Sequence, residues 1–544
     1  MSLRERYYLL LAFSIGTLAF LYFCDWRFLN PKNVGWLFIG ANSDKAQAFL
    51  GWEFFRKSSW EFPLGSNYDF GLLPGNSIAY SDSIPLLAIV GKIFNSFFAN
   101  EIQYFGVWLL LCFILQSLFA ALIVKIFTNR TSIVFAASCL LVSTPFFLQR
   151  TPIHLALSGH FLILASLYLF LKSAQRSLPR YAWVSINVMT LMVHPYLFFM
   201  VFVIYFGYLL NTGIRKIRKW KWLILEGLSS VVLVFLISIA VLGIPLSSDV
   251  GSSEIPYGTH PWNLLSIFNP RDWPRFFDLY PARDSGFDTF SYPGLGGLLI
   301  MTASLFLFFI HKNLAMKILL RHKIIVFVVL GLLLFAITNR VGIGNFRIVL
   351  FESEFLENKL SLFRSSARMS WPFLYGLIFF SIYGLCKFAS KKTANLIILV
   401  SLVIQFADVM QAPGFLFPQK FTSYSQAGPA IDSLWKGLAG NYERILVVQN
   451  QKDDVTGWPE ISSVAAELGM STNSAYLARY NSKDRNALNA KIVSDLKSDS
   501  LDQDAIYVVY GHPKFEFNLS NKKSKQIFLD DKVVILPLRS STSS

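Results

Sequence analysis

Long apolar stretches alternate with short polar ones over residues 1–410. Eleven of these stretches approach or reach the length of about 20 residues that a helix needs to cross a bilayer. They span residues 7–24, 103–124, 131–149, 155–171, 181–193, 195–210, 222–243, 295–310, 324–338, 371–386 and 394–410. The pattern predicts an α-helical polytopic membrane protein with about eleven transmembrane helices. A further apolar run at 83–98 is a candidate twelfth.

Residues 411–544 follow a different pattern, rich in Ser, Asn and Asp, with short runs of β-branched residues. Continuous apolar runs of this length are typical of buried strands, and the intervening segments have helical spacing. The expected strands are 444–448, 505–510 and 532–536, and the expected helices are 460–468 and 483–498. We therefore expect two domains: a multi-pass membrane domain, residues 1–410, and a small C-terminal α/β domain, residues 411–544.

The composition supports a membrane protein. Of the 544 residues, 54% are hydrophobic and only 15% are charged, and the mean hydropathy is +0.47. Soluble proteins carry nearer a quarter charged residues, so a cytosolic enzyme, a disordered chain and a fibrous repeat are excluded. The four cysteines lie in or beside apolar segments, which leaves no disulfide framework and no CxxC-type metal site. Because no small-residue cleavage site follows the first apolar run, we expect a retained helix rather than a signal peptide.

The net charge of +16 is informative about topology. If 83–98 does not cross the membrane, the segments on one side hold nineteen Lys and Arg and one acidic residue, Glu5. On the other side, the segments 25–102, 244–294, 339–370 and 411–544 hold 29 basic and 30 acidic residues. The positive-inside rule then predicts a cytoplasmic N-terminus and an extracytoplasmic C-terminal domain. If 83–98 did cross, the basic run 215–219 would face outward, so we expect 83–98 to be an interfacial or re-entrant helix. Topology accounts for the whole positive excess, and nothing argues for nucleic-acid binding.

Only two acidic residues, Glu226 and Asp408, fall within the predicted helices, each near a helix end. Ion-coupled transporters usually hold a carboxylate near the bilayer midplane, and many are built from two matching halves. The sequence shows neither feature, which argues against a transporter.

The first outer loop holds the leading catalytic candidate, Asp44. The apolar spacing after it predicts an amphipathic helix that begins at Asp44 and lies on the membrane surface. The helix dipole keeps a carboxylate at such a position ionised. Asp44 is either a helix cap or a general base or metal ligand that faces a substrate at the lipid–water boundary. Asp82, directly before the 83–98 helix, is a second N-cap by pattern and a weaker catalytic candidate.

Other outer-loop residues suggest substrate binding. Glu61 and Asp69 lie in an aromatic, Gly-rich loop, a composition typical of sugar contacts and also of simple anchors at the membrane interface. Arg364 and Arg368 are four residues apart, which predicts one shared helical face at the start of the 371–386 helix. Two guanidinium groups on one face suit a diphosphate or a phosphate-linked lipid head. The alternative is that they bind lipid head groups non-specifically or anchor the helix.

Four of the seven histidines fall near the predicted outer face, and none has the HExxH spacing or another metal-binding spacing. A lone histidine in such a position is more often structural. We prefer His194 as a functional candidate because Pro195 defines its turn, and His260 in the second outer loop is a further candidate for substrate binding. No GxSxG, Walker A or GxGxxG motif occurs in a supporting structural context, so the sequence does not indicate a serine hydrolase or a nucleotide-binding protein.

Taken together, these features resemble the GT-C class of membrane glycosyltransferases. The shared features are an acid about twenty residues past the first helix, a surface helix after it, eleven membrane helices and an outer C-terminal domain. The chain is more closely similar to an uncharacterised bacterial inner-membrane protein family assigned to that class. The similar stretches cover nearly the whole chain and include 62–65, 81–86, 104–113, 263–270, 363–368 and 472–480.

The resemblance implies a hexosyltransferase that moves a sugar from a polyprenyl-phosphate carrier to a glycan or lipid-linked acceptor on the extracytoplasmic face, in O-antigen modification or other cell-envelope decoration. GT-C enzymes place their essential acid in the first outer loop, and Asp44 matches that position. Asp44 would deprotonate the acceptor while Arg364 and Arg368 stabilise the leaving phosphate, with inversion at the anomeric carbon. Many members carry paired acids, whereas Lys45 follows Asp44 here. This favours a base acting alone, with a divalent cation as the alternative.

Three other functions compete with this one. The first is an O-antigen ligase or polymerase, which also uses polyprenyl-linked glycans and outer-loop arginines. The second is a transporter or flippase of lipid-linked glycans. The third is a non-catalytic scaffold whose outer domain binds envelope partners. Membrane lipids are expected partners in every case.

Overall fold

The computed structural model describes residues 3–39, 44–97, 101–173, 179–243, 256–271, 273, 287–429, 431–438, 440–448, 457–510, 524–529 and 532–538. Packing divides the chain into two compact units. The helical unit comprises Met1–Asn30, Tyr104–Val234 and Ser253–Ser423, and the mixed unit comprises Pro31–Gln103, Phe235–Ser252 and Tyr424–Ser544.

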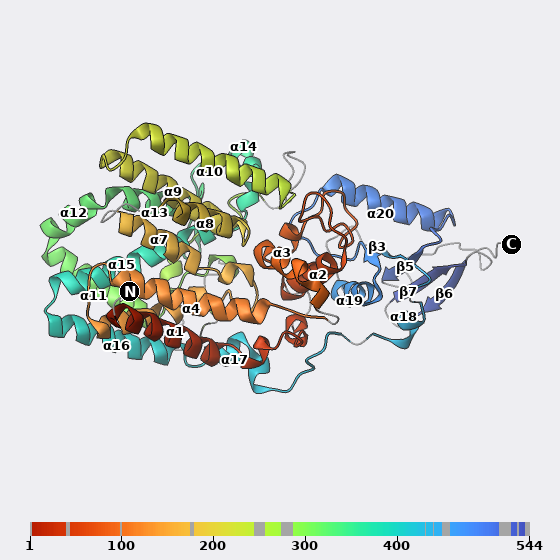
Figure 1. Ribbon diagram of the computed structural model, residues 1–544, viewed down its shortest axis with the longest axis horizontal. Coiled ribbons are helices and arrows are strands. Elements are labelled where there is room, and N and C mark those ends of the chain that lie inside the picture. The colour runs from red at the N-terminus through yellow and green to blue at the C-terminus, as the bar shows by residue number, and fades with distance from the viewer. Residues whose placement is uncertain are drawn as a thin grey trace. The chain divides into compact units, whose positions relative to one another are not determined.

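The helical unit is a bundle of apolar helices (Figure 1). Its longer helices are α1 (Leu3–Phe23), α4 (Phe105–Val124), α5 (Thr131–Val142), α7 (Phe161–Ser173), α8 (Arg180–Leu191), α9 (Pro195–Ile214), α10 (Trp220–Ala240), α11 (Leu295–Ile310), α12 (Lys312–Arg321), α13 (Lys323–Ile337), α15 (Trp371–Phe388) and α16 (Lys391–Val409). Short helices and turns of this unit are η1 (Trp26–Leu29), α6 (Pro145–Leu148), η5 (Ala156–Ser158), η6 (Ser266–Phe268), η7 (Phe287–Thr289), α14 (Glu354–Lys359), η8 (Ser361–Phe363), η9 (Ser366–Ser370), α17 (Ala412–Leu416) and η10 (Pro418–Phe421). An antiparallel hairpin, β1 (Arg340–Ile343) with β2 (Phe346–Val349), follows α13. Helix α4 packs against α1, α5 and α7, helix α9 against α7, α8 and α13, and α11 against α15 and α16.

The prediction of many apolar helices is confirmed, since all eleven predicted segments are helical. In the described part of the chain, seven helical segments are long and apolar enough to cross a membrane, or eight if the bent pair α11 and α12 forms one span. The axes of that pair differ by 108°. The other predicted segments, α5, α8 and α13, have 12, 12 and 15 residues, which by itself is short for a span.

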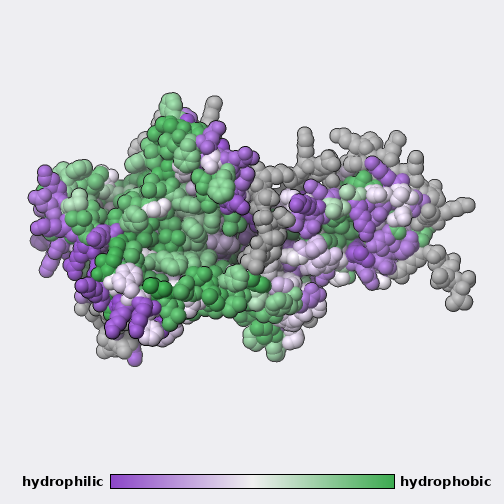
Figure 2. Space-filling view, turned by 90° about the horizontal axis from the view of Figure 1, so that it is seen from above, coloured by the Kyte–Doolittle hydropathy of each residue, from purple (hydrophilic) through white to green (hydrophobic). Residues whose placement is uncertain are grey.

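The exterior of the helical unit has the character expected of a lipid-facing surface. Phe306, Phe309, Phe327 and Leu334 are 67–74% exposed, on helices α11 and α13. Hydrophobic residues cover most of the face of this unit that Figure 2 shows, with hydrophilic residues gathered at its end. Exposed apolar surface on this scale would be unfavourable in water and is favourable in lipid.

The apolar run at 83–98 forms only the short helix α3 (Pro85–Ile93) and the turn η4 (Asn95–Phe97). Nine helical residues are about 14 Å long, well short of a bilayer's hydrocarbon core. Its length agrees with the prediction that this run does not cross. The expected N-cap role of Asp82 is wrong. Helix α3 is preceded by Ile84, and Asp82 instead ends the turn η3 (Ile78–Ser81) in a left-handed conformation, with φ of 54°.

A five-stranded sheet forms the C-terminal part of the mixed unit. Its strands are β3 (Arg444–Val448), β4 (Ser471–Thr472), β5 (Ala505–Tyr510), β6 (Ser524–Phe528) and β7 (Lys532–Pro537), in the order β4-β3-β5-β7-β6. Strand β3 is parallel to β4 and β5, whereas β7 is antiparallel to β5 and β6. Helices α18 (Ser433–Leu438), α19 (Trp458–Leu468) and α20 (Ser482–Lys497) accompany it. All three predicted strands and both predicted helices are present. Strands β4 and β6, which are short or partly polar, were not predicted.

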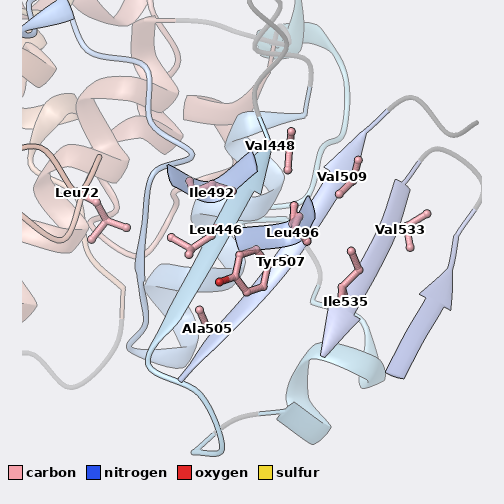
Figure 3. Close-up of a cluster of buried hydrophobic side chains, with 10 residues drawn as sticks. All are labelled: Leu72, Leu446, Val448, Ile492, Leu496, Ala505, Tyr507, Val509, Val533 and Ile535. Carbon is pink, nitrogen blue, oxygen red and sulfur yellow. The ribbon is translucent and has the colours of Figure 1, made fainter. Parts of the chain in front are cut away.

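Part of the segment 25–102, the predicted first outer loop, belongs to the same core as this sheet. Leu72 packs with Leu446, Ile492 and Tyr507 in one buried cluster (Figure 3). The backbone also joins the sheet, because Gly71 N donates to Thr472 O and Thr472 N donates to Asp69 O, at 2.8 and 3.0 Å. The mixed unit therefore contains residues from both sides of the expected domain boundary at residue 410.

Helix α2 (Asp44–Lys57) begins at Asp44, as predicted, but its expected place on a surface is wrong. Residues 45–56 are all buried, with α3, η3 and α19 among the elements that cover them. Its apolar stripe therefore faces protein, and its polar side chains are enclosed as well.

Candidate functional site

The helical unit contains a group of buried charged side chains, Arg150, His154, Asp288 and Arg368, which we call the Asp288 cluster. Asp288 Oδ1 accepts hydrogen bonds from Arg368 Nη2 at 2.6 Å and from Arg150 Nη1 at 3.1 Å. Ser365 Oγ donates to Asp288 Oδ2 at 2.6 Å. His154 Nε2 lies 3.4 Å from Arg368 Nη2 and 3.9 Å from Asp288 Oδ1. One carboxylate thus holds two guanidinium groups and has a histidine beside it.

Local structure brings these side chains together from three segments. Arg150 and His154 belong to the turns that follow α6, where Arg150 N donates to Phe147 O at 3.1 Å. Asp288 lies in the turn η7. Arg368 lies in η9, which leads directly into α15. Each charged residue is therefore at the end of a helix or in a short turn, where its side chain can point away from lipid.

Aromatic rings complete the enclosure. The Arg368 guanidinium lies 5.0 Å from the Tyr196 ring centre, and the Arg150 guanidinium lies 5.4 Å from that of Trp371. Tyr196 Oη also accepts a hydrogen bond from Ser365 N at 3.0 Å. Ring faces attract cations most strongly when both groups are out of water. The arginines are thus fixed by stacking as well as by the carboxylate.

The charged side chains of the cluster are largely buried. The Arg150 side chain is fully buried, that of Arg368 is 9% exposed and that of Asp288 is 20% exposed. Burial alone would raise the pKa of Asp288, but the guanidinium groups of Arg368 and Arg150 hold it well below its usual range. Asp288 is therefore ionised and a poor base. The carboxylate orients two guanidinium groups, whose planar shape and permanent charge suit phosphate oxygens.

Arg364 and His260 lie next to this cluster, but the helical face predicted for Arg364 and Arg368 is wrong. Arg364 ends the turn η8, and Ser365, with φ of −93° and ψ of 56°, separates it from η9. The Arg364 guanidinium makes no hydrogen bond or ion pair with the described residues.

Burial lowers the pKa of His260, Asp288 opposes this, and Arg364 and Arg368 lower the pKa further. His260 is therefore neutral at pH 7.

His194, the preferred histidine, has a structural role. It is the N-cap of α9, and its Nδ1 accepts a hydrogen bond from Tyr196 N at 3.1 Å. Pro195 then occupies the first helical turn, where its missing N–H costs nothing. By capping α9, His194 positions Tyr196, whose ring covers Arg368.

The other predicted site residues, Asp44, Asp82, Glu61 and Asp69, belong to the mixed unit and not to the Asp288 cluster. Asp44 is partly buried in the first turn of α2, where the helix dipole favours its charge. Glu61 is exposed. Burial raises the pKa of Asp69, Glu61 raises it further, and Lys92 opposes both.

Beside Glu61 and Asp69, the structure reveals a buried lysine, Lys92, that is 5% exposed. Its Nζ lies 4.1 Å from the Phe55 ring centre and 4.7 Å from that of Trp60. It donates to Ser58 Oγ at 3.0 Å and to Ser59 O at 3.1 Å. Burial lowers the pKa of Lys92 to about 8, although the nearby carboxylates oppose the shift. We call Lys92 with these two rings the Lys92 cage.

The two acidic residues within predicted helices have local partners. Glu226 forms an ion pair with Arg218 at 2.6 Å. Asp408 accepts hydrogen bonds from Tyr292 Oη at 3.1 Å and from Leu295 N, at the first residue of α11, at 3.0 Å. These contacts give each carboxylate a structural role, so neither points to a transported ion.

Sequence reasoning did not single out Asp288, Arg150 or Lys92. Arg150 was detectable, because it follows a long apolar run at a predicted helix end, where a cation has to find a partner. Asp288 and Lys92 carry no local signal, since their partners are distant in the chain. Within the described residues, no three His, Cys, Asp or Glu side chains come together to hold a metal ion, so no divalent-cation site is assigned.

Comparison with known families matches both parts of the chain. The model of a domain of unknown function, DUF6311, matches residues 13–410, and the DUF6311 C-terminal domain matches residues 434–536. The comparison with curated proteins found no match. Because the first model spans more than half of the sequence, the chain belongs to the DUF6311 family.

Proposed function

We propose that this protein is a membrane glycosyltransferase that moves a sugar from a polyprenyl-phosphate carrier to a cell-envelope glycan or lipid-linked acceptor. The observation that carries the proposal is the pair of buried guanidinium groups of Arg150 and Arg368, with the Arg364 guanidinium beside them, which makes no hydrogen bond or ion pair with the described residues. Buried charge in a membrane protein is costly and is usually kept for function. Planar guanidinium groups bind phosphate oxygens in pairs, which suits a phosphate-linked lipid.

In the proposed reaction, the acceptor hydroxyl oxygen attacks the anomeric carbon of the donor sugar. The bond between that carbon and the phosphate oxygen breaks, and the phosphate leaves with the electron pair. A general base takes the hydroxyl proton. Arg364 and Arg368 stabilise the charge that develops on the leaving phosphate. Asp288 is a positioning residue, because its carboxylate orients Arg150 and Arg368 and is too weak a base to accept the proton.

Asp44 is the proposed general base. Its support is its place in the first turn of α2, its partial exposure and the resemblance to GT-C enzymes. A single displacement with one base inverts the configuration at the anomeric carbon. General-base catalysis typically contributes about 10²–10⁴ in rate.

The wider architecture belongs to the same proposal. We infer a GT-C-type fold in which all eleven apolar segments cross a bacterial inner membrane, with a cytoplasmic N-terminus. The helical state of every segment and the distribution of Lys and Arg support this topology. The short helices α5, α8 and α13 can cross where the membrane is locally thin or where their flanking turns add length.

The test uses a strain deleted for this protein and complemented with wild type or a variant. The readout is the mass of surface glycans and of polyprenyl-linked sugars, at matched membrane levels of the protein. We expect a hexose-sized mass difference with wild type that Arg364→Gln, Arg368→Gln and Asp44→Asn each reduce about 10²-fold or more. Lys359→Gln, which removes an exposed charge from the same outer loop, is the matched control and should behave as wild type.

Each contrary result points to another function. Transfer of a whole glycan chain would indicate a ligase or polymerase. Polyprenyl-linked sugars that accumulate unchanged in mass would indicate a flippase. If all three variants restore what wild type restores, the transferase proposal fails and a scaffold becomes the better explanation.

A further inference from the structure

A second cationic feature of the helical unit is a pocket of about 470 Å³ where the ends of α4, α5 and α16 meet. Residues 125–130 and Lys391 line it. Its cations are Lys125, Arg130 and Lys391, and the lining includes no Asp or Glu among the described residues. The pocket is distinct from the Asp288 cluster, with which it shares no residue.

The three cations are not neutralised by the protein. None of them forms an ion pair with a carboxylate of the described chain. Among the described residues, the Arg130 guanidinium donates only long hydrogen bonds, to the backbone carbonyls of Lys391 at 3.5 Å and Cys386 at 3.4 Å. Lys125 Nζ lies 4.3 Å from the Tyr8 ring centre, an attraction that leaves its charge in place.

Two helix N-termini add to the positive potential. Helix α5 begins at Thr131 and α16 begins at Lys391, and their first turns adjoin, since Ser132 Oγ donates to Asn395 Oδ1 at 3.4 Å. The N-cap of α5, Arg130, provides no side-chain acceptor for the first N–H groups. Ser390 Oγ caps α16 by accepting from Thr393 N at 3.1 Å, so the first-turn N–H groups without a side-chain cap are those of α5. These groups and the dipoles of both helices favour an anion at this place.

The positive-inside rule explains why these segments carry cations, but not why three of them converge on one concave site with two helix N-termini. We propose that this pocket binds a phosphate group, carried by an anionic phospholipid at the membrane surface or supplied as free inorganic phosphate. The proposal does not depend on the glycosyltransferase function. Basic pockets between membrane helices are known to suit anionic lipid head groups.

The first measurement compares phosphatidylglycerol, phosphatidylcholine and inorganic phosphate as probes. Dissociation constants of the purified full-length protein are measured in detergent by native mass spectrometry. We expect tighter binding of phosphatidylglycerol than of zwitterionic phosphatidylcholine. If millimolar inorganic phosphate displaces phosphatidylglycerol, phosphate alone is the ligand. If phosphatidylglycerol stays bound in its presence, the lipid is the ligand. Equal affinity for the two lipids, with no binding of phosphate, would overturn the proposal.

The second measurement uses the pair Arg130→Gln and Lys391→Gln. Each cation near a phosphate contributes about fivefold in affinity, so the double variant should bind the preferred anion about 25-fold more weakly. The matched control is Lys312→Gln with Lys317→Gln, two exposed lysines of α12 that lie outside the pocket and should change affinity less than about twofold. Equal losses in both pairs would show non-specific attraction and overturn the proposal. If the double variant does not fold, Lys125→Gln replaces it.

Discussion

The two units each bury a cation site, and they compensate the charge in opposite ways. In the helical unit, Arg150 and Arg368 remain charged and share the carboxylate of Asp288. In the mixed unit, Lys92 has aromatic rings and neutral oxygens as its closest contacts, and its pKa falls to about 8. The reason is chemical, since a lysine can lose its proton when buried but an arginine cannot. A site that must stay cationic in an apolar setting therefore needs arginine and a carboxylate.

This difference also bears on function. A phosphate-binding site has to be cationic at neutral pH, and the guanidinium groups of the Asp288 cluster meet that requirement. The Lys92 cage, with a pKa of about 8, can exchange a proton near neutral pH. Phosphate binding is therefore proposed for the cluster and not for the cage.

The largest expected effect comes from removing the shared carboxylate. Asp288→Asn removes the carboxylate that two buried guanidinium groups share, so we expect the free energy of unfolding to fall by about 3–5 kcal/mol. The measurement is denaturant unfolding of the purified protein in detergent. Asp432→Asn, at an exposed position, is the control. A loss below about 1 kcal/mol would show that the arginines do not depend on Asp288.

The next effect tests whether deprotonation matters in the Lys92 cage. Lys92→Arg introduces a charge that cannot be lost, whereas Lys92→Met removes it and keeps much of the volume. We expect Lys92→Arg to be less stable than Lys92→Met by about 1–3 kcal/mol at pH 9, where much of the native lysine is neutral. Thermal unfolding of both variants at this pH gives the comparison. The reverse order of stability would mean that the cage holds a charged group without cost.

A smaller effect is the pH dependence of stability in the mixed unit. The folded pKa of Lys92, about 8, is below the unfolded value of about 10.4, so the unfolded state binds more protons between these values. Stability should therefore rise with pH from about 8 to 10, by at most about 1.4 kcal/mol per pH unit. Lys45, whose pKa burial also lowers to about 8, adds to the rise.

Hydrogen exchange of the mixed-unit peptides measures this rise locally. Lys92→Met should reduce it, while peptides around Asp288 should show no matching rise. The pKa of Asp288 is depressed, so its contribution is lost only as pH falls through a value well below the usual carboxyl range. A rise that survives replacement of both Lys45 and Lys92 by Met would contradict the assignment.

The smallest expected effect is that of Arg364→Gln on stability. The Arg364 guanidinium makes no hydrogen bond or ion pair with the described residues, so the free energy of unfolding should change by less than about 0.5 kcal/mol. Arg368→Gln, which breaks the contacts to Asp288, should cost several times more. Unfolding curves of the two variants, measured under the same conditions, distinguish an arginine that stabilises the fold from one that serves a ligand. Equal losses of unfolding free energy in the two variants would contradict this distinction.

Much of the secondary structure was predictable from the sequence, because its signals are local. All eleven apolar segments are helical, and strands β3, β5 and β7 begin at the residues where their apolar runs begin. Helix α2 also begins at the predicted residue, Asp44. The prediction of its environment was wrong, because apolar spacing shows which face of a helix is apolar but not whether lipid or protein covers that face.

The candidate site was predictable only in part. Arg368 was identified from its type and position, but the reasoning that placed Arg364 on the same helical face was wrong, because Ser365 interrupts the helix. Asp288 was missed because its partners, Arg150 and Arg368, are 138 and 80 residues away in the chain. No local pattern encodes such a pairing.

The sequence by itself determined the helices of the eleven apolar segments, three of the five strands of the C-terminal sheet and the asymmetric distribution of charge, since each follows from the spacing or count of nearby residues. Only the tertiary structure decided which buried charges meet, that Leu72 of the first loop joins the core of a sheet more than 370 residues later, and that α2 is enclosed. The physical reason is that burial and ion pairing depend on distances between segments, which chain folding sets and local spacing does not.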